Sequence, residues 1–171
     1  MLIIDVQDRL APATHDSEST VANCVRLVRA ARRLDIPLLA TEHYPKGLGP
    51  TVKPLAALIS KHEMVEKIHF SCAADPGFRR RFEAFGRDQV AVAGLEAHVC
   101  IMQTAIALRR AGQMVAVIAD AVTSRSPSDR DLALDRLRAE GVLLASAEMI
   151  LFEWLERGDT AAFKDVFTLI R

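Results

Sequence analysis

Three side chains whose types could do chemistry together stand at the ends of short apolar runs. Asp5 follows an apolar triplet, Lys67 lies near the end of the segment 64–68, and Cys100 follows the run 90–93. Such runs are typical of buried strands, and the carboxyl ends of parallel strands converge on one crevice of a doubly wound sheet. A thiol needs a base to remove its proton, and a thiolate needs a cation. We therefore predict one nucleophilic site built from Asp5, Lys67 and Cys100.

Cys100 opens a helix that the sequence predicts over 100–112, and this helix is apolar almost all round. The positive end of a helix dipole stabilises a thiolate, and such sites lower a cysteine pKa from about 8.5 to roughly 3.5–7.5. We therefore expect a lowered pKa for the Cys100 thiol. Taken alone, Cys100 could instead be a small apolar residue that fills space. Cys24 belongs to an apolar stripe, and Cys72 lies in a loop, where it could be the resolving thiol of a redox sensor.

Strand and helix patterns alternate along the whole chain. The expected strands are 2–4, 38–40, 64–68, 90–93, 114–119 and 142–144, and the expected helices are 17–35, 54–59, one that begins at 76, 100–112, 127–141, 147–157 and 160–170. Residues 45–50 are expected to form a loop. This alternation predicts a single α/β domain over 1–171, a three-layer α/β/α arrangement with a six-stranded, mostly parallel, doubly wound sheet.

The composition narrows the classes of partner. Lysine plus arginine balances aspartate plus glutamate at 22 each in 171 residues, which argues against nucleic acid or an anionic membrane as the main partner. No apolar run approaches the ~20 residues of a membrane span. Three cysteines without CxxC spacing indicate a reducing compartment, and Asp5 interrupts the apolar start of the chain. We expect a cytoplasmic protein without a signal peptide that acts on a small molecule.

Five segments give the sequence a resemblance to the isochorismatase-like cysteine hydrolases, which include nicotinamidases and N-carbamoylsarcosine amidases. The resemblance covers nearly the whole chain and is carried by LIIDVQ at 2–7, TEHYPKGLG at 41–49, EKIHFS at 66–71, GLEAHVC at 94–100 and DAVTSR at 120–125. It implies a catalytic triad on Asp5, Lys67 and Cys100. It also implies a non-proline cis peptide between Leu95 and Glu96, with the backbone N–H groups of Glu96 and Cys100 turned toward an oxyanion.

Two departures from relatives refine the expected chemistry. Nicotinamidases bind a metal through Asp-x-His, whereas this chain has Thr41-Glu42-His43, so we expect no metal. Some isochorismatases, which cleave a vinyl ether, lack the cysteine. The presence of Cys100 favours hydrolysis of a small amide or ester, at a C–N bond other than a peptide bond, through a thioester. A vinyl ether hydrolase and a non-catalytic scaffold are the alternatives.

Further expectations concern cofactors, pocket walls and assembly. Gly47 and Gly49 do not continue into a dinucleotide fingerprint, because the third position is Val52, so no cofactor is expected. The expected substrate-binding residues are Gln7, Tyr44, Phe70 and His98. The helix 147–157 carries apolar side chains on more than one face, and contiguous exposed apolar patches are uncommon on monomers. We therefore expect a homo-oligomer of at least two chains, although the two last helices could instead cover each other.

Overall fold

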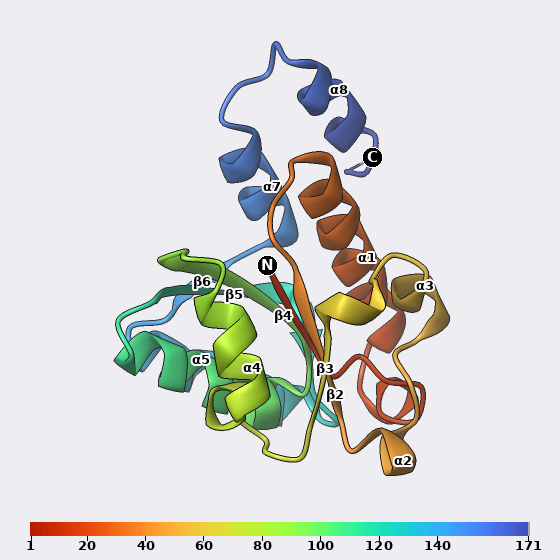
Figure 1. Cartoon of the computed structure of the whole chain (residues 1–171), viewed down its shortest axis with the longest axis vertical. Coiled ribbons are helices and arrows are strands. Elements are labelled where there is room, and N and C mark those ends of the chain that lie inside the picture. Colours follow the sequence, from red (N-terminus) through yellow and green to blue (C-terminus); the bar gives the residue numbers. More distant parts are fainter. Residues whose placement is uncertain (171) are drawn as a thin grey trace.

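The computed structural model describes residues 1–170. Within this range one six-stranded sheet has the order β3-β2-β1-β4-β5-β6, and every neighbouring pair of strands is parallel (Figure 1). The strands are β1 (Leu2–Ile4), β2 (Leu39–His43), β3 (Met64–Lys67), β4 (Gln89–Leu95), β5 (Met114–Thr123) and β6 (Leu143–Ala145). The predicted α/β class and doubly wound sheet are confirmed, and the sheet is parallel throughout.

Helices cover both faces of the sheet and enclose two apolar cores. One core contains residues of α1 (Ser17–Arg33), α3 (Lys53–Ala56), α7 (Ala147–Leu155) and α8 (Ala161–Phe167). The other contains residues of α4 (Pro76–Glu83), α5 (Met102–Arg110) and α6 (Pro127–Ala139). The central strands supply both cores because successive side chains of a strand point to opposite faces. Ile3 packs into the first core, whereas Leu2 and Ile4 pack into the second.

Strands β1 and β4 lie next to each other, and the strand order reverses between them. Chain connections leave in opposite directions here, and a doubly wound sheet binds its ligands at this switch point. Gly94 allows the two strands to approach closely. Its φ is +124°, and a Cβ atom added to it would lie 2.1 Å from the carbonyl oxygen of Ile4. Any side chain at this position would therefore push β1 and β4 apart.

Several element boundaries differ from the sequence-based expectations. Strands β2 and β4 continue to His43 and Leu95, beyond the expected ends at residues 40 and 93. Strand β5 continues past Ala119 to Thr123, because the polar Asp120 interrupts the apolar pattern without ending the strand. Residues 45–48 of the expected loop form a short helix, α2 (Pro45–Leu48), which Pro45 begins at its first position. The helix of Cys100 begins earlier than expected, with a π-helical turn at Ala97–Ile101 before α5.

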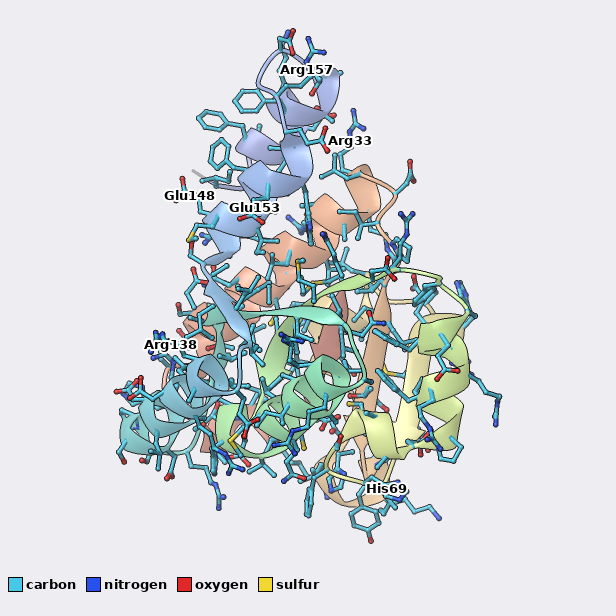
Figure 2. The ribbon with its side chains drawn as sticks, turned by 90° about the vertical axis from the view of Figure 1, so that its left-hand side faces the viewer. Arg33, His69, Arg138, Glu148, Glu153 and Arg157 are labelled. Carbon is cyan, nitrogen blue, oxygen red and sulfur yellow. The ribbon has the colours of Figure 1, made fainter. Side chains whose placement is uncertain are left out.

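The last two helices extend beyond the amino ends of the strands, alongside α1 (Figure 1). An ion pair of 2.6 Å between Arg33 of α1 and Asp165 of α8 joins these helices. Figure 2 shows Arg157, which precedes α8, at the opposite end of the molecule from His69, which follows β3. No helix within residues 1–170 is long and apolar enough to cross a membrane.

A second ion pair ties α1 to the segment before β3. Glu63 is buried and pairs with Arg32 of α1, whose side chain is 38% exposed. Burial raises the pKa of Glu63, but hydrogen bonds from Arg32 and Ser60 outweigh this effect and hold the pKa at about 2. The pKa of Glu63 is thus lower in the folded protein than its ordinary value of 4.5. Ionised Glu63 therefore stabilises the fold at pH values above 4.5, and this stabilisation is lost as the pH falls through 2.

The variant Glu63→Gln tests this pH dependence. At neutral pH we expect it to lower the free energy of unfolding by about 1 kcal/mol, a small value because Arg32 is partly exposed to water. Urea denaturation of the two proteins should show this difference shrinking as the pH falls from 4.5 to 2. A difference that stays constant with pH would contradict the role given to the ionised carboxylate.

Candidate active site

The side chains of Asp5, Lys67 and Cys100 meet at the carboxyl ends of the strands. The Nζ atom of Lys67 lies 2.6 Å from Oδ2 of Asp5 and 3.8 Å from Sγ of Cys100. Its third donor points to the carbonyl oxygen of His69 at 3.1 Å. The side chains of Asp5 and Lys67 are both 0% exposed. All three donors of the ammonium group are therefore used, and its position is fixed.

Each of the three residues is placed by the end of a strand. Asp5 directly follows β1, Lys67 ends β3, and Cys100 lies in the turn after β4. Asp5 has a φ of 52°, in the left-handed region that aspartate tolerates better than most residues. Its backbone N–H donates to the carbonyl oxygen of Thr41 at 3.0 Å, so the first residue beyond β1 remains attached to β2.

The turn between β4 and Cys100 has an irregular backbone. The peptide bond between Leu95 and Glu96 is cis, at the position that the family resemblance implied. The carbonyl oxygen of Glu96 accepts hydrogen bonds from the N–H groups of Val99 and Ile101, at 3.1 and 3.2 Å. This turn places Cys100, 5% exposed, beside the Lys67 ammonium.

The expectation of a lowered pKa for Cys100 is wrong. Burial of the thiol and the nearby carboxylate of Asp5 raise the pKa of Cys100 above its usual range, and the Lys67 ammonium offsets only part of this. Burial lowers the pKa of Lys67, but the Asp5 carboxylate beside it is the main opposing effect, and the pKa is raised overall. The site at rest therefore contains a charged lysine and a neutral thiol. Reasoning from the helix dipole alone omitted the cost of burying a thiolate.

The four expected pocket residues lie at different depths. Gln7 is fully buried, and its amide group is used by the backbone: it donates to the carbonyl oxygens of His43 and Gly49 and accepts from the N–H of His43. Gln7 thus holds the segment that carries Tyr44. Tyr44 and Phe70 are 50% and 53% exposed, and the ring of Phe70 lies 5.2 Å from that of His43.

The fourth residue, His98, belongs to a polar network beside the turn that carries Cys100. Its Nδ1 atom lies 2.8 Å from Oγ of the buried Ser124. Arg125 contacts Nε2 of His98 at 3.5 Å and donates to the carboxylate of Glu96 at 2.9 Å. Strand β5 brings this group here because Thr123 pairs with Leu95 of β4. Because β5 was expected to stop at residue 119, Arg125 and Ser124 were not among the expected site residues.

A second buried side chain, that of Thr41, contacts Asp5, and the buried Cys72 contacts Thr41 in turn. Oγ1 of Thr41 donates to Oδ1 of Asp5 at 2.7 Å, and Sγ of Cys72 lies 3.8 Å from the same Thr41 oxygen. Burial raises the pKa of Cys72 to about 11. The sequence contained a usable signal for Thr41, which stands next to Asp5 if β2 is placed beside β1.

The Thr41-Glu42-His43 segment is engaged within the protein. The carboxylate of Glu42 accepts hydrogen bonds from the N–H and hydroxyl of Thr51, at 2.6 and 2.7 Å. Among residues 1–170, no three histidine, cysteine, aspartate or glutamate side chains are grouped so that they could hold a metal ion. That the protein works without a metal stays a prediction.

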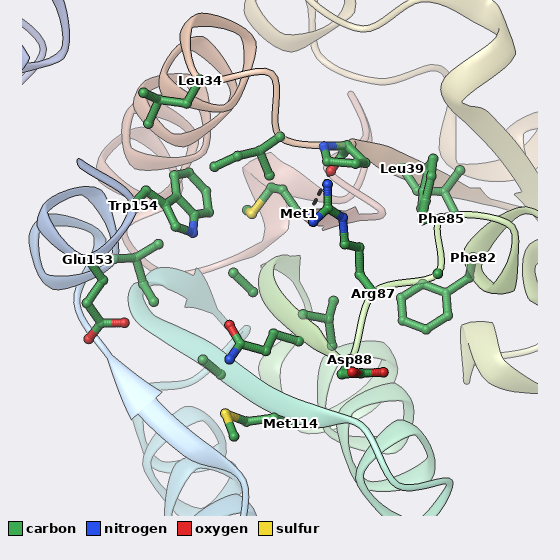
Figure 3. Close-up of a pocket in the computed structure, with 18 of the residues that line it drawn as sticks. Met1, Leu34, Leu39, Phe82, Phe85, Arg87, Asp88, Met114, Glu153 and Trp154 are labelled. Atoms are coloured by element: carbon green, nitrogen blue, oxygen red, sulfur yellow. Dashed lines mark hydrogen bonds between the residues drawn. The ribbon is translucent and has the colours of Figure 1, made fainter. Parts of the chain in front are cut away.

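A cavity of about 730 Å³ lies at the other end of the sheet. It is bordered by the amino ends of strands and by α7, with Met1, Arg87 and Trp154 among its lining residues (Figure 3). Asp5, Lys67 and Cys100 do not line it. This cavity is therefore separate from the cluster of reactive groups, and the chemistry of the side chains in that cluster identifies the candidate site.

The fold and the site together define a doubly wound α/β protein with a cysteine, a lysine and an aspartate at its switch point. Residues 1–149 match the model of the isochorismatase domain, and the chain belongs to this family. Isochorismatase domain-containing protein 2 of Danio rerio is 38% identical over 171 residues, which cover 99% of this chain and 85% of that protein.

Solved structures have the same fold. A Caenorhabditis elegans protein described as MAR1 ribonuclease is 34% identical, with a TM-score of 0.92 over 99% of this chain and 87% of that one. YcaC of Escherichia coli, described as an octameric hydrolase of unknown specificity, is 23% identical, with a TM-score of 0.92 over 98% and 85% of the two chains. The latter likeness concerns the fold alone.

The buried ion pair between Asp5 and Lys67 can be tested by stability. Replacing one partner leaves the other charge buried without compensation, so Lys67→Met should lower the free energy of unfolding by about 3–5 kcal/mol. The double variant Asp5→Asn with Lys67→Met removes both charges and should lose much less than the two single variants together. Urea denaturation followed by circular dichroism measures this. Additive losses would show that the two residues do not depend on each other.

Proposed function

We propose that this protein is a hydrolase that uses Cys100 to cleave a small amide or ester through a thioester. Family membership supports a hydrolase. The observation that carries the finer proposal is the contact of one buried ammonium, on Lys67, with both the carboxylate of Asp5 and the thiol of Cys100. A base, a cation and a nucleophile lie within reach of one another, which is the arrangement that acyl transfer requires.

The neutral thiol determines the order of events. Cys100 attacks the substrate carbonyl as its proton passes to the nearby carboxylate of Asp5. Lys67 stays charged and stabilises negative charge on sulfur as it forms. The backbone N–H groups of Glu96 and Cys100 hold the oxyanion. Asp5 then gives the proton to the leaving amine, which departs and leaves a thioester. Asp5 next removes a proton from water, which attacks the thioester, and the acid leaves as the thiol regains its proton.

The rim of the site suggests a small substrate with an apolar or planar part. Tyr44 and Phe70 follow the ends of β2 and β3, and Ile68, between Phe70 and Lys67, is 62% exposed. These side chains provide apolar surface next to a buried polar centre. Ligand sites commonly have this composition, an apolar wall with few polar groups that fix orientation.

Ribonuclease activity, which the description of the Caenorhabditis elegans relative names, is a weaker candidate for this chain. Exposed aromatic rings such as Tyr44 and Phe70 could stack on bases. A surface that binds RNA also needs an excess of positive charge, whereas this chain has 22 basic and 22 acidic residues. We therefore propose amide or ester hydrolysis and treat RNA cleavage as a contrary outcome.

Mass spectrometry of the intact protein tests the nucleophile. After rapid quenching of reactions with acetamide, benzamide, nicotinamide or p-nitrophenyl acetate, we expect one of these compounds to add an acyl mass to Cys100. Cys100→Ala should lose the adduct and lower turnover by at least about a thousandfold. The control Cys24→Ser lies in the core, where its hydroxyl can keep the contact with the carbonyl oxygen of Ala121, and it should keep both the adduct and the turnover. Treatment with EDTA should change neither.

Three results would contradict this proposal. The first is the absence of an acyl mass with every compound. The second is an equal adduct in Cys100→Ala. The third is cleavage of an RNA oligonucleotide that Cys100→Ala retains. A vinyl ether hydrolase or a scaffold protein would give the first result.

We also propose that the protein assembles into a homo-oligomer through α7. Met149 and Phe152 of this helix are 52% and 42% exposed, and Leu143 at the start of β6 is 55% exposed. Ile150, Leu151 and Leu155 are buried, so this helix supplies the core and still presents apolar side chains outside. The octameric state described for YcaC of Escherichia coli supports an assembly in this fold.

Light scattering at micromolar concentration should give a mass of at least twice the 18.8 kDa of one chain. Replacing Met149 and Phe152 together by Glu should reduce this mass to that of a single chain, because buried unpaired carboxylates oppose association. The control is Leu132→Glu on α6, at a side chain that is 70% exposed. A single-chain mass for the unmodified protein, or an equal effect of the control, would refute the α7 interface.

A further inference from the structure

Thr41 contacts Asp5 at two points. Strand β2 pairs with β1 so that Thr41 stands opposite Ile4, and its carbonyl oxygen accepts the N–H of Asp5 at 3.0 Å. Its hydroxyl also donates to Oδ1 of Asp5 at 2.7 Å. Thr41 is 1% exposed and Asp5 is 0% exposed. Thr41 therefore hydrogen-bonds both the backbone N–H and the carboxylate of Asp5, and both contacts are buried.

The direction of the hydroxyl bond follows from the chemistry of its partners. An ionised carboxylate only accepts hydrogen bonds, so the single hydrogen of the Thr41 hydroxyl points to Asp5. The Thr41 oxygen is then free to accept the S–H of Cys72, whose sulfur is 3.8 Å away. Cys72 is 0% exposed. The order of donation is thus from Cys72 to Thr41 to Asp5, and the buried thiol fixes the rotamer of the hydroxyl.

This arrangement divides the two oxygens of Asp5 between two partners. Thr41 occupies Oδ1, and the Lys67 ammonium occupies Oδ2 at 2.6 Å. Two donors on opposite oxygens fix the plane of the carboxylate. The left-handed backbone at Asp5, with a φ of 52°, lies outside the regular strand, so these contacts rather than the pleat of β1 aim the side chain.

We propose that Thr41 is a positioning residue, whose hydroxyl holds the Asp5 carboxylate in the orientation that moves a proton between the Cys100 sulfur and the leaving group. Cys72 supports it by fixing the hydroxyl. The inference rests on the proposed role of Cys100 as nucleophile. Thr41 touches neither the sulfur nor the substrate, and its effect passes through Asp5.

The test compares Thr41→Val, which removes the hydroxyl at nearly constant volume, with Thr41→Ser, which keeps it. The readout is the rate of acyl-enzyme formation on Cys100 by intact-mass spectrometry. The probes are p-nitrophenyl acetate and whichever of acetamide, benzamide and nicotinamide acylates the unmodified protein. An amine must leave with a proton, whereas p-nitrophenolate leaves without one. Both reactions need Asp5 to take the proton of Cys100, but only the amide needs Asp5 to pass a proton on to the leaving group. The loss in a Thr41 variant should therefore be larger for the amide.

We expect Thr41→Val to slow acylation by the amide at least about tenfold, the loss typical of a hydrogen bond to a charged group. Acylation by the ester should slow less, and Thr41→Ser should behave as the unmodified protein with both probes. Equal losses with amide and ester would show that Thr41 does not guide the proton to the leaving group and would overturn the inference. So would an unchanged amide rate in Thr41→Val, or a loss in Thr41→Ser as large as in Thr41→Val.

Two controls keep these outcomes interpretable. Thermal unfolding of each variant identifies any that does not fold, and if Thr41→Val is such a variant, the comparison of Thr41→Ser with Thr41→Ala decides by the same criteria. Failure of the proposed function has a different signature, because the unmodified protein itself would then acquire no acyl mass from any probe. Failure of the Thr41 inference appears only when the unmodified protein is acylated.

Discussion

Burial of the ion pair between Asp5 and Lys67 constrains the rest of the structure. A charge taken out of water costs several kcal/mol, even after relaxation, and its partner offsets this only with good geometry and further hydrogen bonds. Here Lys67 uses all three of its donors, and both oxygens of Asp5 have partners. Asp5 directly follows β1 and Lys67 ends β3, and β2 separates these two strands. Ile4 pairs with Thr41 of β2 and Lys67 pairs with His43 of β2, so the register of β2 determines where the two side chains meet.

Strand β4, which lies on the other side of β1 from β2, must then bring the Cys100 thiol next to the ion pair of Asp5 and Lys67. Gly94 is decisive, because its missing side chain lets β4 approach the backbone of Ile4. Beyond it the chain turns through Glu96 and the π-helical turn before it enters α5. The strand-end geometry therefore comes from the parallel sheet, whereas the final placement of Cys100 comes from irregular backbone that no periodicity describes.

This division explains how much could be predicted from the sequence. The apolar runs predicted the sheet, since a buried parallel strand needs nearly continuous apolar residues, and the strand ends predicted where Asp5, Lys67 and Cys100 would gather. Contacts that depend on which residues of neighbouring strands stand opposite each other could not be predicted from the apolar runs. Thr41 was expected at the end of a strand and within the segment 41–49 that carries the family resemblance, but not as a partner of Asp5, and Arg125 lay beyond the expected end of a strand. Single residues that usually interrupt an element, such as Asp120 inside β5 and Pro45 at the start of α2, led to wrong boundaries because their context is tertiary.

The pKa of Cys100 shows why position in a helix is insufficient to describe a nucleophile. A helix N-terminus and a lysine favour the thiolate, but burial and the carboxylate of Asp5 outweigh them, so the thiol keeps its proton. The ion pair of Asp5 and Lys67 acts on the thiol in both directions. The Asp5 carboxylate, which is the proposed base, raises the pKa of Cys100, whereas the Lys67 ammonium lowers it. In the proposed mechanism a thiolate forms only as the proton passes to Asp5 at the moment of attack. Under that proposal proton transfer is coupled to bond formation, and the orientation of the Asp5 carboxylate is as important as the nucleophile itself.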